Sequence, residues 1–163
     1  MIGIMANSDG RLEAAQAAAE VFRASGVDLV IHCGDIGGRH VLDAISVANG
    51  AFGDGVFVWG DRDHDRTGLM RYGQSLGLTC FGMMGELEAS DKRIFVLHGD
   101  NKTILKKLIA EQQYDYIICG HALVTEDHTV GKTRILNPGP VHGDAKSAML
   151  LDLESGKVKL VAL

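Results

Sequence analysis

The chain has 163 residues, of which 46% are apolar and 23% are charged. A chain of this length is expected to form a single domain over residues 1–163, and it can bury a core without disulfide or metal staples. The composition excludes intrinsically disordered and fibrous proteins. No apolar run approaches the roughly 20 residues that cross a bilayer, so we expect no membrane-spanning segment.

Charge and cysteine content indicate which binding partners and which cellular compartment to expect. Sixteen Lys and Arg residues against 21 Asp and Glu residues give a net charge of −5, and the basic residues are scattered. Bulk charge therefore attracts neither nucleic acid nor an anionic membrane. The N-terminus lacks a basic flank before its short apolar stretch, which predicts an unprocessed cytoplasmic protein. Cys33, Cys80 and Cys119 are an odd number of cysteines, and we expect them to be reduced thiols in the core.

Strand-like and helical patterns alternate along the first half of the chain. Each short β-type run is followed by a polar turn and then by a segment with apolar residues on one helical face. Asp65 is the expected N-cap of the third helix. The predicted strands cover residues 2–6, 27–33 and 56–59, and the predicted helices cover 11–25, 40–48 and 69–75.

The second half of the chain is richer in strands. A hairpin with its turn at 90–92 is expected within residues 78–98, so antiparallel pairing enters here. Together with the first half, this order of elements predicts an α/β fold of the layered α+β type. The remaining predicted elements are a helix at 101–113, a strand at 115–119 and two hairpins with turns at Gly131 and at 154–156.

Five of the apolar strands run into polar side chains. In sheets connected by crossovers, ligands bind beyond the carboxyl ends of the strands, where loops converge. A single Asp at such a place is usually a helix N-cap, and a single His beside a glycine is usually a turn residue. Repetition after five strands, with glycines beside nearly every polar residue, instead favours one shared site for a divalent metal ion. The residues are Asn7 and Asp9, Asp35, Asp61 and Asp63, His98 and Asp100, and His121.

The order of these motifs resembles that of the calcineurin-like metallophosphoesterases over almost the whole chain. The resemblance is strongest for the small bacterial and archaeal phosphodiesterases of that superfamily. It implies a two-sheet β-sandwich flanked by helices, with two metal ions, often manganese, at one edge. The motifs are Gly-Asp at 34–35, Gly-Asp-Arg-Asp at 60–63, His-Gly at 98–99, Gly-His at 120–121 and Asn-Pro-Gly-Pro at 137–140.

Four positions depart from the family pattern of D-x-H, G-D, G-N-x-D, H-G, G-H-x-H and N-P-G. Asn7 stands where the family has its first Asp, and Asp9 stands where it has the partner His. Asp61 replaces the usual Asn, and Leu123 replaces the second His of G-H-x-H. The resemblance therefore implies an altered metal site that keeps its carboxylate charge.

The resemblance divides the ligands between two metal positions. The second position would keep four ligands, whereas the first would be left with an oxygen-only set that favours Mn²⁺ or Mg²⁺ over Zn²⁺. We expect one or two divalent ions, with Mn²⁺ first and Mg²⁺, Ni²⁺, Zn²⁺ or Fe as alternatives. The second set is Asp35, Asp61, His98 and His121, and the first set is Asp35, Asp9 and Asn7.

These ligands imply a phosphoesterase of the phosphodiesterase type, in which a metal-activated hydroxide attacks phosphorus. Asn7 is the expected contact to a phosphate oxygen. Arg62, at the position of a family His, can grip phosphate but cannot protonate a leaving group. A surface role for Arg62 is left open, as is His64 as the general acid. His128 and His142 are both candidates to replace the missing imidazoles.

A non-enzymatic role is the alternative. The eukaryotic retromer subunit that resembles these phosphoesterases has lost family histidines and works mainly as a scaffold, so altered ligands are also compatible with a binding module. Retention of Asp35, His98 and His121 favours the hydrolase. Its substrate would be a small-molecule or nucleotide phosphoester, while the natural substrate and a homo-oligomeric state stay open.

Overall fold

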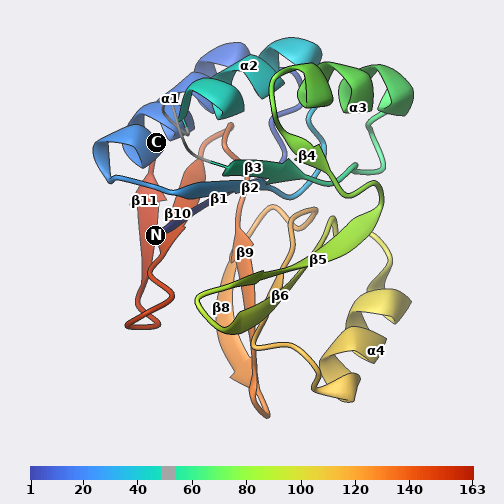
Figure 1. The fold of residues 1–163 in the computed structure, drawn as a ribbon, viewed down its shortest axis with the longest axis vertical. Helices are drawn as coiled ribbons and strands as arrows, with labels where there is room; N and C mark the ends of the chain where they lie inside the picture. The colour runs from blue at the N-terminus through green and yellow to red at the C-terminus, as the bar shows by residue number, and fades with distance from the viewer. Residues whose placement is uncertain (49–53) are drawn as a thin grey trace.

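The computed structural model describes residues 1–48 and 54–163, which form two β-sheets stacked between helices (Figure 1). This arrangement confirms the predicted fold class. The strands of the first sheet are β1 (Ile2–Met5), β2 (Leu29–His32), β3 (Asp54–Phe57), β4 (Thr79–Cys80), β10 (Ser147–Leu151) and β11 (Val158–Ala162). Those of the second sheet are β5 (Met84–Ala89), β6 (Lys92–Leu97), β7 (Tyr116–Ile118), β8 (Thr125–Val130) and β9 (Thr133–Pro138). The helices are α1 (Leu12–Ala24), α2 (Arg39–Ala48), α3 (Arg66–Ser75) and α4 (Lys102–Glu111).

Each sheet combines parallel strands with antiparallel hairpins. The strand orders are β11-β10-β1-β2-β3-β4 and β5-β6-β7-β9-β8. β1, β2 and β3 pair in parallel, as do β6, β7 and β9. The three predicted hairpins are confirmed as β5/β6, β8/β9 and β10/β11. Because parallel strands end at the same edge of a sheet, the loops that follow them gather there.

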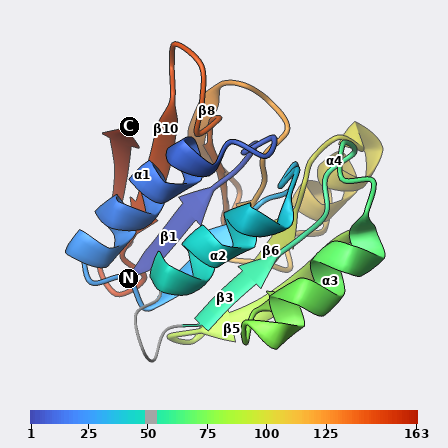
Figure 2. The ribbon, with the colours of Figure 1, turned by 90° about the horizontal axis from the view of Figure 1, so that it is seen from above.

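Apolar side chains form one layer between the sheets and one on each outer face. Between the sheets, Ile4 and Ile31 of the first sheet share a buried core with Val96 and Ile118 of the second. Helices α1, α2 and α3 cover the outer face of the first sheet (Figure 2), and α4 covers that of the second. Burial of this apolar surface stabilises the fold and leaves the polar side chains to the loops at the sheet edges.

Several element boundaries differ from the prediction by one to three residues, and two of them lie on either side of the loop after β3. β3 ends at Phe57 rather than at residue 59, and Trp59 donates its backbone N–H to the carbonyl oxygen of Gly82 at 2.7 Å, beyond the end of β4. α3 begins at Arg66, three residues earlier than predicted, in a polar first turn. The Asp65 carboxylate accepts the backbone N–H of Gly68 at 3.0 Å, which confirms the predicted N-cap.

The helices are short compared with a membrane span. The longest helix among the described residues, α1, has 13 residues, whereas a bilayer needs about 20. Within residues 1–48 and 54–163, no helix combines the length and the hydrophobicity needed to cross a membrane.

The three cysteines are thiols within the fold, as expected. Cys33 and Cys119 are buried, and Cys80 is partly buried. Burial, assisted by the charge of Glu126, raises the pKa of Cys119 to about 12, and burial also raises the pKa of Cys33. Thiols of this kind stay protonated and pack as small apolar groups, so they are not candidate nucleophiles.

Candidate metal centre

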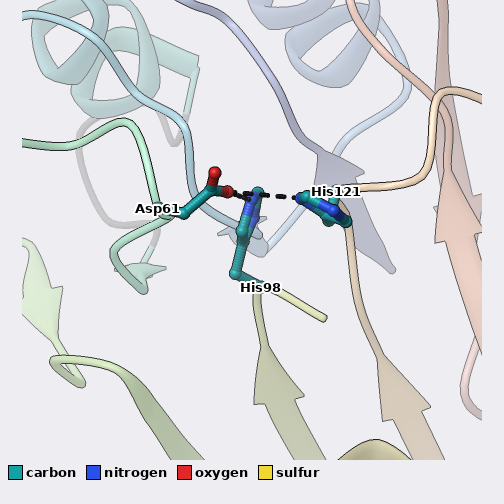
Figure 3. A group of neighbouring side chains, drawn as sticks. All are labelled: Asp61, His98 and His121. Carbon is teal, nitrogen blue, oxygen red and sulfur yellow. Dashed lines mark hydrogen bonds and ion pairs between the residues drawn. The ribbon is translucent and has the colours of Figure 1, made fainter. Parts of the chain in front are cut away.

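Three side chains from three different loops meet at the edge of the sandwich (Figure 3). Asp61 follows β3, His98 follows β6 and His121 follows β7. Asp61 Oδ1 lies 3.0 Å from His98 Nε2 and 3.2 Å from His121 Nδ1. One ligand atom of each residue lies within 4.8 Å of the other two, a spacing compatible with one shared cation. We call Asp61, His98 and His121 the histidine cluster.

Asp35 adjoins the histidine cluster from the loop after β2. Its carboxylate is buried, and its Oδ2 lies 3.4 Å from His98 Nε2. Burial would raise the pKa of Asp35, but hydrogen bonds from His98 and from the Arg62 backbone N–H, together with both positive charges, lower it below its usual value. Asp35 is therefore ionised at neutral pH, which is the form that binds a metal ion.

His98 is held in place through its other ring nitrogen. Nδ1 donates to the carbonyl oxygen of Cys33 at 2.7 Å, which leaves Nε2 facing Asp35 and Asp61. Burial would lower the pKa of His98, but the hydrogen bonds to Asp35 and Cys33 and the charges of Asp35 and Asp61 raise it to about 9. A proton on Nε2 therefore balances the two carboxylates at neutral pH. A metal ion would replace that proton on the same nitrogen.

The backbone near the histidine cluster adopts conformations that most residues avoid. Asn7, Asp9, Asp35 and His121 have φ angles of 55°, 47°, 56° and 60°, in the left-handed region. Such a residue costs on the order of 1 kcal/mol and persists where the surrounding structure imposes it, often at functional sites. At Gly60 no side chain fits, because a Cβ would overlap the Asp35 carboxylate. Tertiary structure therefore overrides local preference to bring these loops together.

Asp63 ties two of these loops to each other. It is 2% exposed and accepts the backbone N–H groups of Ile36, Gly37 and Gly60 at 3.2, 2.9 and 2.8 Å. The loop after β2 and the loop after β3 are thereby joined through one buried carboxylate. The sequence pattern placed Asp63 among the candidate residues of the shared metal site, but its carboxylate is occupied by these backbone N–H groups instead. Its spacing of two residues from Asp61 was the available signal.

Asn137 supports the loop that carries His121. Its Nδ2 donates to the carbonyl oxygens of Gly120 and Ala122 at 2.9 and 3.3 Å, and its Oδ1 accepts the backbone N–H of Gly139 at 3.0 Å. The Asn-Pro-Gly-Pro motif thus holds the His121 loop against the end of β9. The motif was visible in the sequence, but this contact was not.

A second group of side chains contacts Asp35 as well. Arg62 donates its backbone N–H to Asp35 Oδ1 at 3.0 Å, and its guanidinium lies 3.1 Å from Asp9 Oδ2 and 4.0 Å from Asp35 Oδ2. His142, in the loop after β9, brings Nε2 to 2.9 Å from the same oxygen of Asp9. We call Asp9, Arg62 and His142 the arginine group.

Asn7 is a buried polar side chain without a hydrogen-bond partner among the described residues. It is 2% exposed, and neither Nδ2 nor Oδ1 is paired. Its backbone N–H donates to the carbonyl oxygen of Gly34 at 3.0 Å, next to the turn that carries Asp35. A buried polar group left unpaired costs about 1–3 kcal/mol. An orphaned amide on a loop whose backbone pairs with the turn that carries Asp35 therefore points to a ligand.

Not all candidate histidines lie at the site. Of the two considered as replacements for missing imidazoles, His142 contacts Asp9, whereas His128 lies exposed in β8. His64 is exposed in the loop before α3, and Leu123 is 63% exposed. The predicted residues on adjoining loops are Asn7, Asp9, Asp35, Asp61, Arg62, His98 and His121.

Comparison with known proteins identifies the family. The model of the calcineurin-like phosphoesterase superfamily domain matches residues 1–156. The chain belongs to this superfamily. The resemblance drawn from the sequence motifs is thereby confirmed.

Individual relatives agree with this assignment. Phosphodiesterase MJ0936 of Methanocaldococcus jannaschii is 27% identical over 143 residues, covering 87% of this chain and 84% of the relative. An archaeal phosphodiesterase structure superposes with a TM-score of 0.87 at 24% identity and covers 99% of both chains. Vps29 from Entamoeba histolytica, solved in complex with Zn²⁺, gives a TM-score of 0.67 at 16% identity, covering 99% of this chain and 97% of that chain. The two solved structures share the fold.

The side chains of this superfamily member fit a divalent metal ion. Two imidazoles and neighbouring carboxylates suit the first-row divalent metals. The carbonyl group that orients His98 is the usual outer partner of a ligating imidazole. The unpaired amide of Asn7 adds a polar atom that the described protein groups leave unsatisfied.

Proposed function

We propose that this protein is a metal-dependent phosphoesterase of the phosphodiesterase type. The observation that carries the proposal is the meeting of Asp61, His98 and His121 beside the buried carboxylate of Asp35. Four groups from four loops converge at the ends of parallel strands, as a ligand site does and as independent helix caps do not. Superfamily membership and the related phosphodiesterase of M. jannaschii support the same reaction class.

The proposed ligands of the ion are Asp35, Asp61, His98 and His121. We propose Mn²⁺, with Mg²⁺, Ni²⁺, Zn²⁺ and Fe as alternatives, because a mixed set of carboxylates and imidazoles accepts several first-row metals. When bound, a divalent ion neutralises charge on the phosphoryl oxygens and acidifies the water that attacks phosphorus. The Cys33 carbonyl group keeps His98 in the orientation that presents Nε2.

Asn7 and Arg62 are the proposed contacts to the substrate. Asn7 has an unused Nδ2–H₂ donor group, which suits a phosphate oxygen. The Arg62 side chain is 64% exposed while it is anchored to Asp9, so its remaining N–H donors are open to a phosphate group. Because a guanidinium keeps its protons at neutral pH, Arg62 binds and orients the phosphate but does not protonate the leaving group. The substrate class is a small-molecule or nucleotide phosphoester.

The proposal is tested by hydrolysis of bis(para-nitrophenyl) phosphate after metal removal with EDTA and reloading with Mn²⁺. We expect cleavage that depends on the added ion. His98→Ala should lower kcat/KM by about 100-fold or more, because it removes a ligand that no neighbour replaces. His128→Ala is the matched control, since it removes an exposed imidazole from β8, and its activity should equal that of the wild type.

Calorimetric titration with Mn²⁺ separates the ways in which the proposal can fail. An ion that binds without any cleavage would favour the binding-module role. Equal activity of His98→Ala and the wild type would mean that the reaction takes place at another site.

A further inference from the structure

One oxygen of Asp35 lies near two nitrogen groups of different kinds. Its Oδ2 lies 3.4 Å from His98 Nε2, in the histidine cluster, and 4.0 Å from Arg62 Nε, in the arginine group. The Cys33 carbonyl oxygen holds Nδ1 of His98, so Nε2 is the nitrogen available to ligate an ion. The charge on Arg62 is covalently attached and permanent. Asp35 is therefore shared by a candidate ligand of the ion and by a built-in cation.

We infer that the Arg62 guanidinium serves as the second cation of the site, so that the chain binds a single divalent ion and holds the phosphoester between that ion and Arg62. This inference rests on the proposed function and deepens it. It assigns the number of ions and names the protein group that takes the place of another ion.

Asp9 already has two hydrogen-bond donors at one carboxylate oxygen. Its Oδ2 accepts from Arg62 Nη1 at 3.1 Å and from His142 Nε2 at 2.9 Å. An ion bound at Oδ2 of Asp9 would have to displace both donors. The side chains of Asp9 and His142 are only 20% and 21% exposed, so water screens this pair less than it screens a surface pair. His142 acts here as a positioning residue, because it orients the carboxylate that holds Arg62.

The backbone of Arg62 is also anchored at the site. Its N–H donates to Asp35 Oδ1 at 3.0 Å, so the residue is anchored to the shared carboxylate by its main chain as well as its side chain. The next residue, Asp63, is held by three backbone N–H groups of Ile36, Gly37 and Gly60. The loop therefore fixes the backbone of Arg62, and the ion pair with Asp9 holds its guanidinium.

The charges of the carboxylates also match one divalent ion together with Arg62. Asp9, Asp35 and Asp61 contribute three carboxylates to the site. One divalent ion together with Arg62 neutralises them when the ligating imidazoles are neutral. A second divalent ion beside Arg62 would leave an excess of positive charge among closely spaced cations, whose repulsion in a partly buried site is costly. The wild-type site therefore favours one ion.

The test counts bound Mn²⁺ by calorimetric titration and by electron paramagnetic resonance, which distinguishes an isolated ion from a spin-coupled pair. We expect one isolated Mn²⁺ per wild-type chain. Arg62→Ala should bind two coupled ions, because it leaves Asp9 with only the exchangeable His142 contact and removes the competing permanent charge. Arg62→Lys keeps the charge and should bind one.

Arg39→Ala is the matched control. Arg39 forms an ion pair with Asp65 at 3.2 Å and has a similar exposure, 58% against 64% for Arg62, but it lies outside the arginine group. This variant should bind one ion. Two ions in the wild type, or one ion in Arg62→Ala, would overturn the inference and leave the proposed function standing. Absence of Mn²⁺ binding to the wild type would instead overturn the proposed function, and the inference with it.

Discussion

The histidine cluster and the arginine group share Asp35 but balance their negative charge in different ways. In the histidine cluster, Asp61 faces two imidazoles, and the pKa of His98 is raised to about 9 by its carboxylate neighbours against the effect of burial. In the arginine group, Asp9 faces a guanidinium that stays charged at neutral pH. Only the first of these positive charges can be exchanged for a metal ion.

This difference suggests how residues at a candidate metal site can be replaced while positive charge is kept next to its carboxylates. Asp9 stands where the resemblance predicts an imidazole, and the structure surrounds it with Arg62 and His142. A phosphate group needs positive charge near its oxygens, and a guanidinium supplies it with directed N–H donors. In our proposal, the arginine group takes over the electrostatic role of one ion without its ability to acidify water.

Asp63→Ala should have the largest effect on stability. It tests whether the loops that carry the histidine cluster and the arginine group are held together by the same carboxylate. This substitution leaves the N–H groups of Ile36, Gly37 and Gly60 without their carboxylate partner. The free energy of unfolding should fall by about 3–5 kcal/mol in urea titrations. Asp65→Ala, in the same loop, removes a helix cap and an exposed ion pair with Arg39 and should cost about 1–2 kcal/mol. Equal losses for the two variants would show that Asp63 does not join the loops.

A smaller effect on stability depends on pH and arises at His32, which is hydrogen-bonded to Ser8 between Asn7 and Asp9. Gly34 N–H donates to Nδ1 of the buried His32 at 3.2 Å, so Nε2 carries the proton and donates to Ser8 Oγ at 2.7 Å. Burial, together with the charge of His98 and against that of Asp35, lowers the pKa of His32 to about 3. The neutral ring is therefore the folded form.

The sign of the pH dependence follows from this shift. Above the unfolded pKa of about 6.5, neither state binds a proton at His32, and stability is complete. Below it, the unfolded chain gains a proton that the folded chain takes up only near pH 3. Stability of the metal-free protein should fall by up to about 1.4 kcal/mol per pH unit as the pH decreases from 6.5 to 5. His32→Gln should flatten this slope in urea titrations, and the exposed control His128→Gln should retain it.

Asn7→Gly should have the smallest effect on stability. It tests whether Asn7 binds the substrate or supports the fold. Asn7→Gly removes an unpaired buried amide and relieves a φ angle of 55°, so stability should stay level or rise by up to about 1 kcal/mol. Hydrolysis of the diester should nevertheless fall by about tenfold, the value of one hydrogen bond to a charged group. Ser90→Gly relieves a similar φ angle of 48° in the β5–β6 turn and should leave hydrolysis unchanged. Loss of stability without loss of activity in Asn7→Gly would contradict the assigned role.

The order of helices and strands could be predicted because it depends on neighbours in the sequence. Alternating and helical apolar patterns are local, and so is the Asp65 cap that starts α3. The end of β3 was misplaced, and the backbone partner of Trp59 just after it is Gly82, which lies beyond α3 in the chain. No window around Trp59 contains that information.

At the site, the residue types at the strand ends and their agreement with the superfamily pattern could be read from the sequence. Which of these residues meet depends on how the folded chain packs. Packing brought His142 to Asp9 across 133 residues, left His128 exposed in β8 and gave Asp63 three backbone partners. The physical reason is that the apolar layer between the sheets sets where their edges lie, and that layer forms only when distant strands pack together.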